Sequence, residues 1–280
     1  MLGLVIDVAR VEERLILSAL REKFGQVHVI DVGSEPIGLG KAEAELGLAV
    51  IRPISMLRAL YSASFLEALG VHCINSSETI MYSGDKILSY TRLVANKLPV
   101  PRTVLAFTKG AALSAGNELG YPLVVKPPLG SWGRLVTRAR TPMELEVFLA
   151  HREAAKTPHQ RIVVMQEHVE TEGRDIRCLV VGDEVLGCIE RVARNGEWRS
   201  NVALGAETKP YKASGELEDL ALRAAMSVKG FFVSIDLFET SNGFLVNEVN
   251  AVPEFKGFMR ATGINPATVL AEKLYREYRK

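Results

Sequence analysis

The sequence predicts an α/β protein with a parallel sheet in its first third and α+β lobes after it. In about the first hundred residues, short apolar runs alternate with segments whose apolar residues recur at helical spacing. This alternation is typical of a parallel sheet covered by helices. From residue 161 onward, most apolar runs are separated by short polar turns, which is typical of antiparallel strands.

The elements of the first third are strands at residues 2–6, 27–32, 48–51 and 71–74, and helices at 11–24 and 55–69. A domain boundary is expected near Pro99 and Pro101, because two prolines interrupt any helix that begins at Lys86. The next segment is predicted to contain strands at 103–107 and 122–126, a helix at 110–119, a glycine-bearing loop at 127–136 between two strands, and a helix opened by Thr141 and Pro142. The last part is predicted to contain strands at 161–169, 177–181, 184–191, 231–239 and 244–249, and helices at 216–228 and from Asn265-Pro266 onward.

Composition and charge exclude several classes of protein. The chain has 280 residues, 48% of them hydrophobic and 24% charged, as in an ordinary globular enzyme with two or three lobes. A formal net charge of +1 argues against nucleic acid or a membrane surface as a partner. No apolar run approaches the roughly 18 residues of a membrane span, so we expect a cytoplasmic protein.

Two motifs are absent from the sequence, and each absence argues against a class of protein or site. The first strand is followed by D-V-A-R-V-E-E-R, without the G-x-G-x-x-G turn of a dinucleotide site, so a nicotinamide-dependent dehydrogenase is not expected. The three cysteines, Cys73, Cys178 and Cys188, are odd in number and form no CxxC pair. Neither a disulfide framework nor a zinc site is predicted, and all three are expected to be small buried side chains.

Polar residues interrupt an apolar strand near the C-terminal end. The stretch F-L-V-N-E-V-N, residues 244–250, places Glu248 and Asn250 two apart, so that they project from one face of the strand. The preceding strand carries one carboxylate, Asp236. Buried polar groups of this kind need partners.

The loop between these strands decides which groups meet. A two-residue turn at 242–243 would pair Asp236 with Val249, on the wrong face. A three-residue loop at 241–243 pairs Asp236 with Glu248, and we predict this loop. Two carboxylates and the amide of Asn250 then suit a hard cation such as Mg²⁺, the alternative being a hairpin whose polar face is simply solvated.

Basic residues elsewhere favour an anionic ligand. Lys126 ends the apolar strand L-V-V-K, where a buried ammonium needs an anion, and Lys86 lies at a predicted helix start. Each is also compatible with a surface lysine whose stem is buried. The loop from Gly130 to Arg134 has small residues whose N–H groups suit phosphate, although such loops are more often ordinary hairpins.

Taken in order, these elements resemble the ATP-grasp ligases. The matching motifs cover nearly the whole chain: D-K at 85–86, V-V-K-P at 124–127, P-L-G-S-W-G-R at 128–134, Q-E-H-V at 166–169, G-R-D-I-R at 173–177, and D-L-F-E with N-E-V-N at 236–250. The resemblance implies an ATP-grasp fold behind an N-terminal, Rossmann-like parallel-sheet domain. The implied divisions are a pre-ATP-grasp domain at 1–85, a central lobe at 86–168 and a C-terminal lobe with the metal site at 169–280.

The resemblance also implies roles for the motif residues. The residues carried over to ATP are Lys86, Lys126, Gly130, Ser131, Trp132, Gly133, Arg134, Gln166, Glu167, His168, Val169, Arg174, Asp175 and Arg177. Within this set the lysines contact phosphates, 166–169 reads the adenine edge, and Asp175 is expected to orient an arginine. Asp236, Glu248 and Asn250 are implied to hold two magnesium ions.

Three motifs are most similar to those of the LysX-type ligases. These join an amino acid's α-amino group to the C-terminal glutamate of a small acidic, LysW-like amino-group carrier protein, in lysine and arginine biosynthesis. Gly257-Phe258 after E-F-K resembles the glutamate branch, or a dual-specificity member, rather than the α-aminoadipate branch. Phe258 would fill the space of one methylene, worth roughly 1–3 kcal/mol of discrimination, unless it is a core residue.

The implied reaction passes through an acyl-phosphate and needs no covalent enzyme nucleophile. Arg191 and Asn201 are predicted to contact the acyl-phosphate as catalytic residues, since arginine matches carboxylate and phosphate. The remaining predicted substrate contacts are Val202, Ala203, Pro253, Glu254, Phe255, Lys256, Gly257 and Phe258. Arg52 and Arg58 are equally compatible with carrier docking and with solvated surface charges.

Two rival functions share the nucleotide motifs. One is a RimK-type ligase that adds glutamate to a protein tail or a coenzyme. The other is a non-catalytic, nucleotide-binding regulator, which is disfavoured because both lysines and all three metal ligands are present. The resemblance also implies a homo-oligomer, a dimer or a tetramer.

Overall fold

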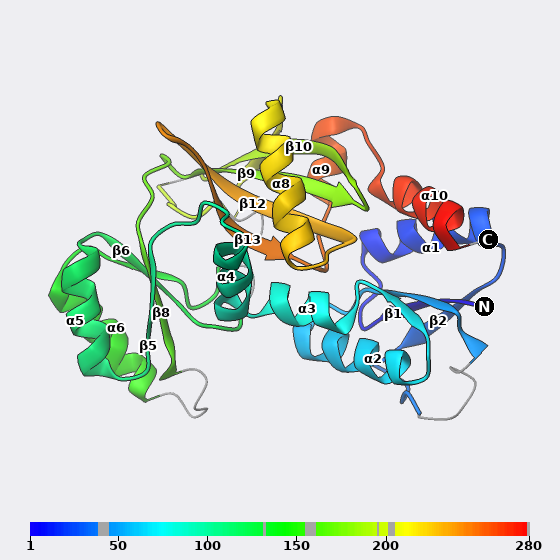
Figure 1. Ribbon diagram of the computed structural model, residues 1–280, viewed down its shortest axis with the longest axis horizontal. Helices are drawn as coiled ribbons and strands as arrows, with labels where there is room; N and C mark the ends of the chain where they lie inside the picture. The colour runs from blue at the N-terminus through cyan, green and yellow to red at the C-terminus, as the bar shows by residue number, and fades with distance from the viewer. Residues whose placement is uncertain (39–44, 131–132, 155–160, 195, 201–204, 279–280) are drawn as a thin grey trace.

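The computed structural model describes residues 1–38, 45–130, 133–154, 161–194, 196–200 and 205–278. Its strands form three sheets, each from a different stretch of the chain (Figure 1). Among the described residues, every helix is too short or too polar to span a bilayer.

The N-terminal sheet is parallel, as predicted, with the strand order β2-β1-β3-β4. Its strands are β1 (Leu2–Ile6), β2 (Val27–Asp31), β3 (Leu48–Ile51) and β4 (His72–Ile74). The helices that cover it are α1 (Val11–Phe24), α2 (Met56–Ala68), α3 (Ser77–Gly84) and the C-terminal α10 (Pro266–Tyr278). Figure 1 shows α1 and α10 on one side of this sheet and α2 on the other. Alternation along β1 explains the two layers, because Leu4 packs with α1 and α10 whereas Val5 packs with α2.

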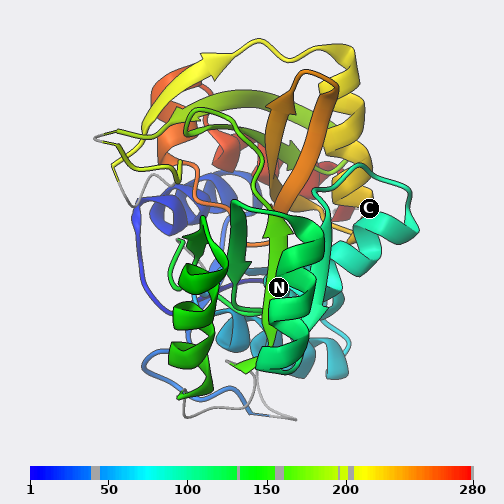
Figure 2. The ribbon, with the colours of Figure 1, turned by 90° about the vertical axis from the view of Figure 1, so that its left-hand side faces the viewer.

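The central lobe contains a four-stranded antiparallel sheet of order β5-β8-β6-β7. Its elements are β5 (Thr103–Ala106), α5 (Lys109–Leu119), β6 (Leu123–Lys126), β7 (Thr137–Ala139), α6 (Pro142–Glu153) and β8 (Val163–Glu167). Helix α4 (Lys86–Ala95) precedes this lobe and ends before the two prolines. As predicted, Thr141 caps α6 and Pro142 is its first residue. Figure 2, in which this lobe faces the viewer, shows α5 and α6 on its outer side.

The C-terminal lobe contains a five-stranded antiparallel sheet of order β11-β10-β9-β12-β13. Its elements are β9 (Arg174–Val181), β10 (Glu184–Val192), β11 (Glu207–Tyr211), α8 (Gly215–Ser227), β12 (Phe232–Thr240), β13 (Gly243–Asn250) and α9 (Lys256–Thr262). One face of the sheet packs on α8 and on Tyr90 and Leu93 of α4. The other face shares a core with the N-terminal domain, through Phe255 and Phe258. This shared core fixes the sheet against the N-terminal domain.

The prediction of a three-residue loop between β12 and β13 is wrong, but the predicted pairing of Asp236 with Glu248 is confirmed. Thr240 pairs with Gly243, so the turn has two residues, 241–242, rather than three. Asp236 nevertheless pairs with Glu248, because the register shifts by one residue at Asn247. This β-bulge supplies the extra residue that we had placed in the loop.

The prediction that the cysteines are unpaired is wrong for two of them. Cys178 and Cys188 form a disulfide between β9 and β10. They are direct partners in the antiparallel ladder, with their Cα atoms 4.1 Å apart. Their spacing of ten residues gives no signal until the strand register is known. Cys73 is free and buried.

Candidate functional site

A cavity between the central and C-terminal lobes brings most of the predicted motifs together. It measures about 920 Å³, its open mouth included. The predicted ATP residues that line it are Lys86, Lys126, Gly130, Gly133, Arg134, Gln166, Glu167, His168, Val169, Arg174 and Asp175. Arg191, Asp236 and Glu248 also line it. Ser131, Trp132, Asn201, Val202 and Ala203 lie outside the described residues.

The two predicted phosphate lysines enter the cavity from different elements. Lys86 begins α4, and its Nζ donates to the Gly130 carbonyl at 2.8 Å and lies 3.3 Å from Glu248 Oε1. Lys126 ends β6 and is 8% exposed. Burial lowers the pKa of Lys126 to about 8, although Glu248 opposes the shift. An anion in the cavity would therefore stabilise the charged form of Lys126.

The side chains of the predicted adenine stretch point to protein partners. Gln166 is 2% exposed, and its Oε1 accepts from Lys126 Nζ at 2.7 Å. Glu167 accepts from the backbone N and the Nε of Arg102, both at 2.8 Å. Two main-chain groups of this stretch are bonded as well, because the Glu167 N–H donates to the Arg102 carbonyl at 3.0 Å and the His168 N–H donates to the Pro122 carbonyl at 3.3 Å. The adenine contact of 166–169 stays a prediction.

Asp236 lies between two arginines. It accepts from Arg177 Nε at 2.7 Å and Nη2 at 2.8 Å, and from Arg191 Nη2 at 2.8 Å. Burial alone would raise the pKa of Asp236, but the two guanidinium groups outweigh it and lower the pKa to about 2. Arg177 does not line the cavity, and both of its bonds given above are to Asp236. Its predicted contact with ATP stays a prediction.

Asp175 holds Arg191, as expected of a residue that orients an arginine. Arg191 Nε donates to Asp175 Oδ1 at 2.6 Å, and Arg191 Nη2 donates to Asp175 Oδ2. Both side chains are almost fully buried. Burial favours the neutral guanidine, but Asp175 and Asp236 outweigh it and raise the pKa of Arg191.

The metal ligands proposed from sequence suit a hard divalent cation. Asp236 faces Glu248 across the ladder, and Asn250 follows on the same face of β13. The Asn250 Nδ2 atom is buried without a hydrogen-bond partner. Because amide O and N positions are assigned from such networks, a flipped Asn250 would offer its oxygen there. Among the described residues, no three His, Cys, Asp or Glu side chains are grouped so that they could hold a metal ion, so an ion would rely on this mixed set.

An aromatic wall was not predicted. Trp198 lines the cavity and contacts the His168 ring edge-on, with centroids 5.7 Å apart. Arg138 Nη1 lies 3.0 Å from His168 Nε2, and Arg199 Nη1 donates to the Gly133 carbonyl at 3.0 Å. The available signal was a tryptophan in the polar stretch W-R-S-N.

The segment 253–258, predicted to bind substrate, lies at the interface between the N-terminal domain and the C-terminal lobe, which we call the seam. Pro253 O accepts from Arg52 Nη2 at 3.0 Å, and Glu254 pairs with Arg10 at 2.9 Å. The remaining members Phe255, Lys256, Gly257 and Phe258 lie beside this seam, none of them on the cavity lining. Phe258 is 2% exposed in the core, which is the alternative left open for it, and its contact with substrate stays a prediction.

Both interpretations of Arg52, carrier docking and a solvated surface charge, are wrong. The side chain is 2% exposed and pairs with Glu13 Oε1 at 2.9 Å, so it is neither solvated nor accessible to a carrier. By contrast, the Arg58 side chain is 55% exposed.

The fold is that of the ATP-grasp ligases. A solved structure of the RimK domain protein ATP-grasp from Sphaerobacter thermophilus DSM 20745 matches with a TM-score of 0.76 and 21% identity. The match covers 97% of this chain and 98% of that chain. The predicted fold class is confirmed.

Sequence similarity then gives the family. Residues 83–274 match the RimK-like ATP-grasp domain, and residues 2–82 match the LysX preATP-grasp domain. The chain therefore belongs to the RimK-like ATP-grasp family, whose members use ATP and Mg²⁺, and it is a carboxylate–amine ligase. The resemblance found in the sequence is confirmed.

Two relatives from Sulfurisphaera tokodaii differ in their amino acid. The Glutamate–LysW ligase ArgX is 45% identical over 99% of this chain and 99% of its own length. The Alpha-aminoadipate–LysW ligase LysX is 36% identical over 98% of this chain and 97% of its own length.

Proposed function

We propose that this protein joins the α-amino group of glutamate to the C-terminal glutamate of a small acidic, LysW-like carrier protein, in arginine biosynthesis. The observation that carries the proposal is the 45% identity with a glutamate–LysW ligase, against 36% with an α-aminoadipate–LysW ligase. The carrier carboxylate attacks the γ-phosphate of ATP, which gives an acyl-phosphate and ADP. The glutamate nitrogen then displaces phosphate and forms the amide.

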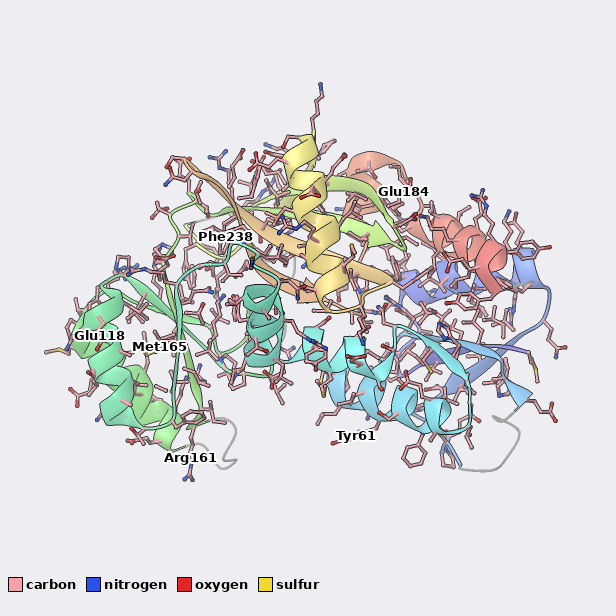
Figure 3. The ribbon with its side chains drawn as sticks, in the orientation of Figure 1. Tyr61, Glu118, Arg161, Met165, Glu184 and Phe238 are labelled. Carbon is pink, nitrogen blue, oxygen red and sulfur yellow. A yellow bond between two sulfur atoms is a disulfide. The ribbon has the colours of Figure 1, made fainter. Side chains whose placement is uncertain are left out.

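The cavity has suitable surfaces for the purine and for the phosphates of ATP. Val124 and Val136 of the central lobe and Phe238 of the C-terminal lobe are apolar lining residues that suit a purine. Figure 3 labels Phe238. Lys86 and Lys126 line the same cavity and would neutralise phosphate oxygens.

The carboxylate side of the cavity would hold magnesium. Asp236, Glu248 and Asn250 are the proposed ligands of two ions, which would shield the negative charge of the transferred phosphoryl group. Arg191, fixed by Asp175, is the proposed contact for the acyl-phosphate, together with Asn201. The protein's contribution is then positioning and electrostatic stabilisation.

Intact mass spectrometry of the carrier tests this function. With the protein, Mg²⁺, ATP and glutamate, the carrier should gain the mass of one glutamyl residue. A carrier that lacks its terminal glutamate is the matched control and should gain nothing. An unchanged mass of the full carrier, with ATP bound by the protein, would favour a RimK-type acceptor instead.

A dual-specificity ligase is the second candidate. The observation that favours it is the burial of Phe258 in the core, away from the cavity lining. A site that discriminates by one methylene gains only roughly 1–3 kcal/mol, so some use of α-aminoadipate is expected even from a glutamate enzyme.

A homo-oligomer is also part of the proposal. Leu57, Tyr61 and Phe65 are spaced by four residues on α2, so they share one face. Their exposed fractions are 47%, 60% and 43%, and Figure 3 shows Tyr61 on the outer side of the N-terminal domain. An apolar stripe of this kind supports a subunit contact through α2.

A further inference from the structure

Four residues at the wall of the cavity form a closed ring of hydrogen bonds, in which Asn247 takes part through both its side chain and its main-chain carbonyl. Lys126 Nζ donates to Gln166 Oε1 at 2.7 Å and to Asn247 Oδ1 at 2.9 Å. Gln166 Nε2 donates to the Tyr90 hydroxyl at 2.7 Å, and that hydroxyl donates to the Asn247 carbonyl at 2.7 Å. We call these four residues the lysine ring. Lys126, Gln166 and Tyr90 are 8%, 2% and 7% exposed and Asn247 is half-buried, so three of the four residues are largely shielded from water.

The direction of every bond in the lysine ring is determined. The Asn247 carbonyl can only accept, so Tyr90 must donate to it and is left as an acceptor. Gln166 must then present its NH₂ group to Tyr90. Its oxygen consequently faces Lys126, which can only donate.

Thr103 gives an independent check on the orientation of Gln166. Its hydroxyl donates to the Pro101 carbonyl at 2.8 Å and is therefore left as an acceptor for Gln166 Nε2 at 3.1 Å. Both neighbours of the Gln166 NH₂ group thus require a donor. A flipped Gln166 would lose both bonds and would turn an NH₂ group toward an ammonium.

The β-bulge makes Asn247 available to the lysine ring. At a bulge, the extra residue leaves the regular ladder, so its side chain and carbonyl can turn to other partners. The Asn247 carbonyl binds Tyr90 of α4, and its side chain binds Lys126 of β6. Asn247 of the C-terminal lobe therefore contacts both α4, which packs on that lobe, and β6 of the central lobe.

We propose that Tyr90, Gln166 and Asn247 are positioning residues for the ligase reaction, which aim the Lys126 ammonium at the phosphates of ATP. An ammonium has three N–H donors in a rotatable group. The lysine ring takes two of them and fixes the rotation, so the third points toward the ligand. This inference rests on the proposed function, because the cavity must take a nucleotide.

Tyr90→Phe tests the proposal without altering the cavity surface. Tyr90 is not a lining residue, and the substitution removes only the hydroxyl that joins Gln166 to Asn247. Gln166 and Asn247, which accept from Lys126, would then no longer be held by the Tyr90 hydroxyl. We expect the dissociation constant for Mg²⁺-ADP and the KM for ATP to rise about tenfold, while the KM for glutamate stays within about twofold.

Tyr121→Phe is the matched control. The Tyr121 hydroxyl is buried in the central lobe without a hydrogen-bond partner, so the same atom is removed and no bond is lost. Mg²⁺-ADP affinity should remain at the unaltered value. Equal losses in Tyr90→Phe and Tyr121→Phe, or equal rises in the KM values of ATP and glutamate, would reduce Tyr90 to a packing residue and overturn the proposal.

Asn247→Ala provides a second, direct test, because it removes the Asn247 oxygen from Lys126 and keeps the backbone carbonyl. Groups that act as one unit do not lose affinity independently. The double variant Tyr90→Phe with Asn247→Ala should therefore have about the same dissociation constant for Mg²⁺-ADP as the single variant that binds it more weakly. Losses that multiply would show two independent residues and contradict the lysine ring.

The nucleotide measurement separates this inference from the proposed function. Calorimetry with Mg²⁺-ADP uses the whole protein and needs no carrier. If the carrier is not modified but the Tyr90→Phe effect is found, the proposed substrate fails and the lysine ring stands. If the unaltered protein does not bind Mg²⁺-ADP, the nucleotide site and the lysine ring both fail.

Discussion

At the residue scale, the charges of the site are paired before any substrate is bound. Arg191 is shared between Asp175 and Asp236, and Arg177 binds the same Asp236. These side chains are largely buried, where an unpaired charge would be strongly unfavourable. The pairing therefore keeps arginines close to the cavity at an acceptable free energy.

Removal of one partner from the buried pair is predicted to destabilise the fold. Asp175→Ala leaves Arg191 with one carboxylate instead of two, and we expect a loss of about 3 kcal/mol in the free energy of unfolding. Asp219→Ala is the matched control, because it breaks an exposed aspartate–arginine pair with Arg223 and should cost less than about 1 kcal/mol. Urea denaturation gives both values. Equal losses would contradict a structural role for the buried pair.

Lys126 makes nucleotide affinity depend on pH. Its pKa of about 8 in the folded protein lies below the ordinary value of 10.5, because burial disfavours the charged form. The unfavourable burial of that charge is fully present below pH 8 and is relieved as pH rises from 8 to 10.5, so this group makes the fold more stable over that interval. Phosphate binding has the opposite dependence, since it needs the ammonium.

We therefore expect the affinity for ADP to fall about tenfold between pH 7 and pH 9. Calorimetry at constant ionic strength measures this fall. Lys126→Met should bind weakly with a nearly flat profile over the same range. A flat profile in the unaltered protein would mean that Lys126 keeps its charge throughout.

The sequence allowed the charged residues of the site to be predicted, but not the neutral residues that hold them. Lysines and carboxylates in apolar strands are visible in the sequence, because burial of an unpaired charge is so unfavourable. Tyr90, Gln166 and Asn247 were not recognised as partners of Lys126. Their contacts depend on a bulge, and a bulge has no signal in the alternation of β13.

At the element scale, the hairpin of β12 and β13 organises the site. Its bulge both pairs Asp236 with Glu248 and turns Asn247 toward Lys126. A shift of one residue would move the carboxylates to opposite faces. The outcome was predictable because the polar residues share a face, but the choice between loop and bulge required the coordinates.

Strands β9 and β10 are joined by a disulfide that a thiol titration can test. Cys73 is buried, and burial raises the pKa of its thiol to about 12, so we expect no reactive thiol in the native protein. Denaturation without reductant should release one thiol per chain, and denaturation with reductant three. Three thiols without reductant would show that Cys178 and Cys188 are not bonded.

Elements with strong apolar patterns were predicted, and short or polar elements were missed. Helix α1 was predicted with the bounds that it has, because its apolar residues repeat at helical spacing. Strand β11 has the sequence E-T-K-P-Y at a sheet edge and has no apolar run. Helices α3 and α9 have only eight and seven residues, too few for a clear period.

At the scale of the whole molecule, the N-terminal domain and the C-terminal lobe share one core. Phe255 and Phe258 pack with residues of α1 and α10, and buried Arg52 joins Glu13 to the Pro253 carbonyl. Residues 253–258 were predicted to bind substrate because their motif resembles the one that follows N-E-V-N in the LysX-type ligases. Contacts between distant segments, such as Arg52 with Pro253, are not visible in local patterns.

The exposed stripe on α2 gives a prediction about assembly. We expect the purified protein to be larger than one chain in light scattering, because Leu57, Tyr61 and Phe65 would be covered by a second copy. Tyr61→Glu should shift the protein toward the monomer, while Met143→Glu, at an exposed residue of the central lobe, should not. A monomer at all concentrations before substitution would remove α2 as an interface.

The central claim is that the protein is a glutamate ligase that acts on a carrier protein. The most direct measurement is ADP release by the purified protein with Mg²⁺-ATP and an acidic carrier that ends in glutamate, with glutamate and α-aminoadipate supplied separately. The account predicts release that requires the carrier and favours glutamate. Equal use of both amino acids would replace the glutamate assignment with a dual-specificity enzyme. No release with either amino acid, despite tight ATP binding, would contradict the claim.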